Sequence, residues 1–209
     1  MGRAVPYKGF DDLLDALAIL KAGGVVTPHA VIAAVTDTPE PTPYQRHLAS
    51  EIIARRLDAT LVTRFNPQLL GLLKHPALTA VVVPSRAEPF GRIPLEAFAA
   101  GAAPVVATTA GGLAELVTDG QTGYTARPHD PASLATALRK ALACSPAERA
   151  RMRAAAHLVA ATCYNHARFL AETAPCALIP SERGQTYRSG SDSAARPPNQ
   201  DPAGQPQST

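Results

Sequence analysis

The fold of this chain is decided by a strand, a loop and a helix that follow one another in Ala80-Val81-Val82-Val83-Pro84-Ser85-Arg86-Ala87-Glu88-Pro89-Phe90-Gly91-Arg92-Ile93-Pro94-Leu95-Glu96-Ala97-Phe98-Ala99-Ala100. The run 80–83 is continuously apolar and rich in valine, which is typical of a strand buried on both faces of a sheet. It ends at a proline, which cannot donate to a sheet ladder. A helix is predicted over 95–100, with Pro94 at its first position, a favoured place for proline.

The same alternation extends in both directions. Further strands are predicted at 31–35, 61–63 and 105–107, and helices at 11–22, 43–57, 68–73, 113–117, 132–143 and 147–169. In the second of these helices, Ile52 and Ile53 are expected to face the core. Apolar strands separated by helices imply a parallel sheet covered on both faces, so the predicted fold class is α/β, a doubly wound, Rossmann-like parallel sheet. Ligands of this class bind beyond the carboxyl ends of the strands, here the loops after residues 35, 63, 83 and 107.

Length and composition bound the domain organisation. The chain has 209 residues, of which 46% are hydrophobic, enough for one domain of ordinary size and a tail. The stretch 181–209 contains no Leu, Ile, Val or Phe. Such a segment cannot bury enough apolar surface to offset the entropy of ordering it. We therefore expect a domain over 1–178 and a disordered tail over 179–209.

Charge and cysteine content exclude several function classes. The net charge is +3 and the Lys and Arg residues are scattered, whereas a nucleic-acid partner needs a clustered basic stripe. The cysteines Cys144, Cys163 and Cys176 form no C-x-x-C pair, so neither a disulfide framework nor a metal site is expected. No apolar run reaches the ~20 residues of a membrane span, and no signal segment opens the chain. A cytoplasmic protein is the default expectation, and attachment to a membrane surface stays open.

Two carboxylates and a glycine give the loop after residue 83 its chemical character. Glu88 precedes a Pro-Phe-Gly turn, and Glu96 is expected in the first turn of the next helix. A helix N-terminus attracts phosphate, and Gly91 allows the backbone to approach a ligand closely. Glu88 could accept hydrogen bonds from sugar hydroxyls and Glu96 from the vicinal diol of a ribose. On spacing alone, an equally good interpretation is that Glu88 is a solvated loop residue and Glu96 a carboxylate that interacts with the helix dipole.

Several motifs in the same order resemble one enzyme family. The segment 84–96 resembles the E-x7-E signature of family 4 glycosyltransferases, the retaining "glycosyl transferases group 1". Segments at 99–108, 111–117, 119–124 and 130–135 are similar to the family's next motifs. Upstream, Gly2-Arg3-Ala4-Val5-Pro6-Tyr7-Lys8-Gly9-Phe10 resembles its G-R-x-x-x-x-K-G segment. The resemblance runs from Gly2 to about Leu142.

The resemblance implies catalytic roles for Glu88, Arg3 and Lys8. Arg3 and Lys8 are expected to hold the donor diphosphate, whose charge grows as the glycosidic bond breaks. Glu88 is expected to contact the transferred sugar. No cofactor and no divalent metal are expected, because the two cations serve the leaving group.

The resemblance also assigns residues to binding of the nucleotide sugar. Backbone N–H groups of Phe90 and Gly91 are expected beside the sugar, and Glu96 at the ribose hydroxyls. The turn that follows the strand at 61–63 lies where the family cradles the base, which gives Arg64 a minor predicted role.

The implied function is transfer of a hexosyl group, with retention of configuration, from a nucleoside diphosphate sugar such as a UDP or GDP sugar to an unidentified acceptor. The chain matches the C-terminal, donor-binding half of the two-domain GT-B fold. In the family a central strand precedes the Gly-Arg segment, and its loss exposes unpaired sheet edges. We expect this strand and the N-terminal acceptor domain to be missing, with a partner supplying that domain in trans. The alternative is a truncated, non-catalytic nucleotide-sugar-binding remnant or module. A dinucleotide-dependent oxidoreductase is set aside because no G-x-G-x-x-G occurs.

Overall fold

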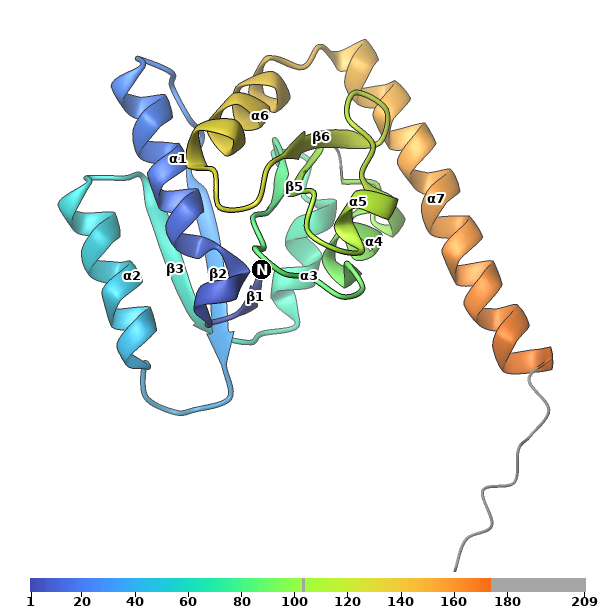
Figure 1. The fold of residues 1–209 in the computed structure, drawn as a ribbon, viewed down its shortest axis with the longest axis horizontal. Helices are drawn as coiled ribbons and strands as arrows, with labels where there is room; N and C mark the ends of the chain where they lie inside the picture. Colours follow the sequence, from blue (N-terminus) through green and yellow to red (C-terminus); the bar gives the residue numbers. More distant parts are fainter. Residues whose placement is uncertain (103, 174–209) are drawn as a thin grey trace, which may run out of the picture. The chain divides into compact units, whose positions relative to one another are not determined.

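A computed structural model gives the structure of residues 1–102 and 104–173, with side chains described up to residue 163 (Figure 1). Residues Met1–Glu172 form one compact unit. The predicted domain end at 178 and the predicted disordered tail over 179–209 lie outside the described residues. Among the helices described, none is both long and apolar enough to cross a membrane.

Strands and helices alternate along the chain, as predicted. The strands are β1 (Gly2–Arg3), β2 (Ala30–Thr36), β3 (Ala59–Arg64), β4 (Val81–Val83), β5 (Val105–Thr108) and β6 (Gly123–Ala126). The α-helices are α1 (Phe10–Ala22), α2 (Pro43–Ala54), α3 (Gln68–Gly71), α4 (Arg92–Ala99), α5 (Leu113–Leu116), α6 (Pro131–Ala143) and α7 (Pro146–Thr173). Two short 3-10 helices, η1 (Pro6–Lys8) and η2 (Leu72–Lys74), complete the set. The sequence analysis predicted neither β1 nor β6.

Every strand pairing described is parallel, which confirms the predicted sheet type. The ladder is divided into two three-stranded sheets, in the orders β1-β2-β3 and β4-β5-β6. The division lies at β1, which has only two residues and pairs Gly2 with Ala34 and Arg3 with Val35 of β2. The rest of β2 lies beyond the end of β1. The two sheets are therefore separate hydrogen-bonded ladders, and the loss of a central strand stays a prediction from the sequence.

An apolar cavity of about 320 Å³ lies at the interruption. Its lining includes Ile32 of β2, Val82 of β4 and Leu17 of α1. Met1 also lines it, and burial, together with the like charge of Lys8, lowers the pKa of the Met1 amino group to about 6, an effect that Glu96 opposes.

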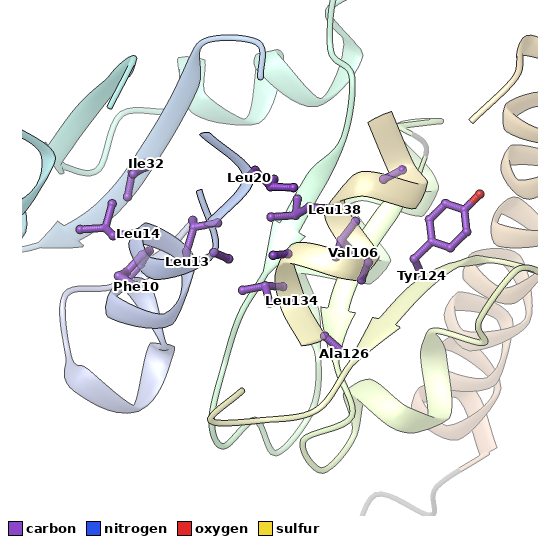
Figure 2. Packing of buried hydrophobic residues seen from close by; sticks show 14 of the residues in the cluster. Phe10, Leu13, Leu14, Leu20, Ile32, Val106, Tyr124, Ala126, Leu134 and Leu138 are labelled. Carbon is purple, nitrogen blue, oxygen red and sulfur yellow. The ribbon is translucent and has the colours of Figure 1, made fainter. Parts of the chain in front are cut away.

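The core lies on both faces of the β4-β5-β6 sheet because strand residues alternate between the faces. Val106 packs into one cluster with Leu134 and Leu138 of α6, and α1 contributes Leu14 and Leu20 to the same cluster (Figure 2). Its neighbours Val105 and Ala107 belong to the opposite cluster, which contains Phe98 of α4, Leu113 of α5 and Ala156 of α7. The sheet is therefore doubly wound, as predicted, and its carboxyl edge carries the loop that follows β4.

Candidate functional site

Two loops meet in backbone contact at the carboxyl edge of the sheets. The first follows β1, and it ends at Gly9, which has a φ of 69° and precedes α1. A Cβ on Gly9 would stand 1.9 Å from the carbonyl oxygen of Pro84, in the loop that follows β4. The amide of Arg86 donates to the carbonyl oxygen of Tyr7 at 2.8 Å. Gly9 is thus required both for its left-handed backbone and for the close approach of the two loops.

This contact brings Lys8 and Glu88 together. The Lys8 ammonium and the Glu88 carboxylate form an ion pair, and their side chains are only 17% and 13% exposed. The Ser85 hydroxyl lies 3.4 Å from the same carboxylate oxygen. The Lys8 nitrogen also lies 5.6 Å from the centre of the Tyr7 ring, within the range of a cation–π interaction. The sequence analysis assigned Lys8 to the donor diphosphate and Glu88 to the transferred sugar. In the structure these two charges neutralise each other.

A second ion pair connects the first turn of α1 with the loop that follows β4, and the sequence analysis missed it. Asp12, in the first turn of α1, receives both Nε–H and Nη2–H of Arg86, at 2.8 and 2.6 Å. The Asp12 carboxylate raises the pKa of the Arg86 guanidinium. Two parallel charge-assisted hydrogen bonds fix orientation as well as distance. Because Arg86 stands two residues before Glu88, the pair holds the Glu88 loop against the Lys8 loop. The sign of this ion pair in the sequence was the presence of Arg86 within the segment that resembles the E-x7-E signature.

The Glu88 loop is supported from its other side by two glycines before α5. Gly111 has a φ of 54°, and a Cβ there would stand 2.4 Å from the Glu88 carbonyl oxygen. The amide of Gly112 donates to that oxygen at 3.0 Å, and a Cβ on Gly112 would stand 2.7 Å from the Pro89 carbonyl oxygen. The sequence analysis did not assign this pair a role in the site. Its role here is to let one backbone pack directly on the other.

Glu96 lies deeper in the helix than predicted. The helix α4 begins at Arg92 after Gly91, whose φ is 67°, so Pro94 is the third residue and Glu96 belongs to the second turn. The predictions of Pro94 at the first position and of Glu96 in the first turn were wrong, because a left-handed glycine starts the helix three residues earlier. Arg92 approaches one carboxylate oxygen of Glu96 at 3.6 Å. The other oxygen is buried and has no hydrogen-bond partner among the described residues.

The remaining predicted residues are more open. Arg3 is exposed, and its guanidinium donates to the Tyr7 hydroxyl at 2.8 Å, close in sequence to Lys8. Phe90 is 80% exposed at the tip of the Glu88 loop, while Gly91 is buried beside it. Arg64 is exposed at the end of β3, on the carboxyl edge of the sheet that contains β1. The structure thus joins Lys8 with Glu88 directly, and it leaves the predicted role of Arg64 without a contact that supports it.

The site has no evident metal centre. Within the part of the chain whose side chains are described, no group of three or more His, Cys, Asp or Glu residues is placed to hold a metal ion. Independence from a metal or a cofactor stays a prediction from the sequence.

Comparison with known proteins shows which family and which relatives the chain resembles. The profile of the family "Glycosyl transferases group 1" matches residues 1–159. The chain is 37% identical over 160 residues to a D-inositol 3-phosphate glycosyltransferase of Streptomyces avermitilis, a match that covers 74% of this chain and 34% of that protein. It is 46% identical over 107 residues to a glycogen synthase of Mycobacterium tuberculosis, which covers 49% of this chain and 25% of that one. The chain therefore spans about a third or less of the length of these relatives.

Solved structures agree with this assignment. The protein superimposes with a TM-score of 0.68 on Alr3699/HepE of Anabaena in complex with UDP, at 28% identity over 83% of this chain and 47% of that chain. It also superimposes with a TM-score of 0.59 on the C-terminal domain of the group 1 glycosyl transferase LpcC of Francisella tularensis, at 26% identity over 78% of this chain and 83% of that domain. The fold is that of one Rossmann-like half of a GT-B glycosyltransferase.

Proposed function

Because the chain belongs to the glycosyl transferases group 1 family, we propose that it is the donor-binding half of a hexosyltransferase. Its donor is a nucleoside diphosphate sugar, its acceptor comes from another domain or chain, and the configuration at the transferred carbon is retained. UDP is the first nucleotide to test, because Alr3699/HepE, which resembles the chain at 27–28% identity, was solved with UDP, with UDP and glucose, and with UDP-glucose.

One observation carries the proposal: a buried carboxylate oxygen of Glu96 has no hydrogen-bond partner among the residues that the structure describes. Buried polar atoms in folded proteins are nearly always hydrogen-bonded, and an exception calls for an explanation. A pair of ribose hydroxyls could donate to this carboxylate and remove the deficit. The unsatisfied oxygen therefore supports Glu96 as an acceptor for hydroxyl groups of a ligand.

Two cations suit the rest of the donor. Arg3 ends β1 and Lys8 lies in the loop that follows it, and both could reach a diphosphate. As the glycosidic bond breaks, negative charge accumulates on the departing diphosphate, and nearby cations stabilise that charge. Glu88 stands where the hydroxyls of the transferred sugar could donate to it. This division of roles needs no group beyond the side chains of the two loops.

Transfer itself also requires an acceptor to be held against the donor, and proximity supplies a large part of the rate. Since the chain covers about a third of the length of its relatives, we expect it to bind the donor by itself and to transfer the sugar only with an acceptor-binding domain. A non-catalytic module that binds nucleotide sugars is the second candidate. Adding the corresponding acceptor domain of a relative in trans would separate the two.

Calorimetric titration of the chain with UDP, GDP and ADP tests the donor site. We expect saturable binding of one nucleotide and a loss of about 1–3 kcal/mol in Glu96→Ala, the size of a lost charge-assisted hydrogen bond. The matched control is Glu51→Ala, because Glu51 pairs with Arg55 near the far end of α2. This variant should bind the nucleotide as the wild type does. A folded chain that binds none of the three nucleotides would contradict the proposal.

A further inference from the structure

The ion pair between Lys8 and Glu88 carries an inference that rests on the proposed donor site. Each side chain is more than four-fifths buried, so each charge has lost most of its water and depends on the other for compensation. The partners lie 80 residues apart in the sequence, and backbone contacts fix the two loops that carry them. The pair is thus built into the site and is not a chance meeting of two flexible side chains.

When a nucleoside diphosphate without a sugar enters the site, the Lys8 ammonium is already paired with Glu88. For Lys8 to turn towards the phosphate oxygens, it must release the Glu88 carboxylate. Released without a replacement, that carboxylate is largely desolvated, and among the described side chains it keeps only the Ser85 hydroxyl at 3.4 Å. Removing one partner of a desolvated ion pair is unfavourable because the other charge stays uncompensated. Binding of a nucleoside diphosphate is therefore weakened because it leaves the Glu88 carboxylate without a compensating charge.

An intact nucleotide sugar avoids this cost. Its diphosphate takes Lys8, and its sugar hydroxyls donate to Glu88 in place of the ammonium. We propose that the Lys8–Glu88 pair makes the site select the intact sugar donor over the free nucleoside diphosphate. Glu88 is then a residue that determines specificity, in addition to its predicted contact with the sugar. The same exchange helps the spent nucleotide to leave after transfer.

The test compares the dissociation constants of UDP and UDP-glucose, measured by calorimetry, for the wild type and for Glu88→Gln. Glutamine keeps the size of the side chain and removes its charge, so Lys8 is held at most by a neutral amide oxygen and is released more easily. We expect UDP to bind about tenfold more tightly in the variant, while UDP-glucose binds no more tightly than in the wild type. The preference for the sugar nucleotide should therefore fall by about tenfold or more. If GDP is the nucleotide that the chain binds, GDP and GDP-glucose replace the uridine compounds.

Two further variants make the interpretation specific. In the double variant Lys8→Gln/Glu88→Gln, loss of Glu88 should no longer tighten UDP binding relative to Lys8→Gln, because no cation remains to be released. Glu88→Asp, which withdraws the carboxylate by one methylene, should tighten UDP binding in the same direction, and it serves if Glu88→Gln does not fold. Glu51→Gln is the matched control and should change neither constant.

Three outcomes are informative. A selective gain for UDP that disappears without Lys8 supports the proposal. An equal gain for UDP and UDP-glucose would overturn it, since simple removal of a negative charge near a phosphate favours both ligands alike. An unchanged UDP affinity in a folded variant would also overturn it. Failure of the wild type to bind any nucleotide contradicts the donor site itself, so the two proposals fail in different ways.

Discussion

The Asp12–Arg86 pair gives the most direct test of how the site is held together. Asp12 has a side chain that is 9% exposed, and Arg86 has one that is 25% exposed. In Asp12→Asn one oxygen still accepts from the guanidinium, but the new amide nitrogen meets the other N–H donor. The variant loses one charge-assisted hydrogen bond and places two donors face to face.

The magnitude follows from burial. A charge-assisted hydrogen bond contributes about 1.5–3 kcal/mol, and breaking a fully buried ion pair costs about 3–5 kcal/mol. Since a quarter of Arg86 is exposed, water can recover part of the loss. We therefore expect the free energy of unfolding to fall by about 2–3 kcal/mol, which for a unit of this size lowers Tm by about 4–12 °C.

Urea unfolding of the wild type and of Asp12→Asn measures this difference, provided that the slope m is unchanged. The matched control is Asp58→Asn, because Asp58 pairs with His29 at the surface and is mostly exposed. That variant should cost less than about 0.5 kcal/mol. The affinity for UDP should also fall in Asp12→Asn, because the Glu88 loop loses its anchor. An unfolding free energy equal to that of Asp58→Asn would refute the reasoning.

Two other predictions follow from the same structure. Gly111→Ala should lower the free energy of unfolding by more than about 2 kcal/mol, since a left-handed backbone is combined with a Cβ 2.4 Å from the Glu88 carbonyl oxygen. Gly120→Ala, where the backbone is also left-handed but nothing lies close to the Cβ, should lower it by only about 1 kcal/mol in urea unfolding. Equal losses would show that the packing contact of Gly111 contributes nothing. Burial raises the pKa of Tyr124 from 10.0 to about 12. The folded state therefore holds this proton more tightly than the unfolded state, so stability is lost as the pH rises from about 10 through 12, and Tyr124→Phe should lose less over that interval. Identical pH profiles of the two proteins, followed by urea unfolding, would exclude this contribution.

The sequence was least informative about orientation within an element. The helix predicted over 43–57 ends at Ala54, and of the two isoleucines expected to face the core only Ile52 does, while Ile53 is 75% exposed. Consecutive residues of a helix point about 100° apart, so adjacent apolar residues cannot both lie at the centre of one buried stripe. The predicted start of α4 was also too late in the sequence. The left-handed Gly91 that precedes this helix leaves no pattern in the spacing of apolar residues.

The sequence by itself determined the α/β class and the parallel sheet, and it predicted the loop after Val83 as the candidate site. These features follow from local patterns, since apolar periodicity reports burial and strand type directly. Only the tertiary structure decided that Lys8 neutralises Glu88, that Asp12 fixes Arg86 across 74 residues, and that Gly111 supports the Glu88 backbone. Such contacts depend on which loops the crossover connections bring to one edge of the sheet. A charge or a glycine carries no local sign of the partner that it will meet there, so its role emerges only when the chain is folded.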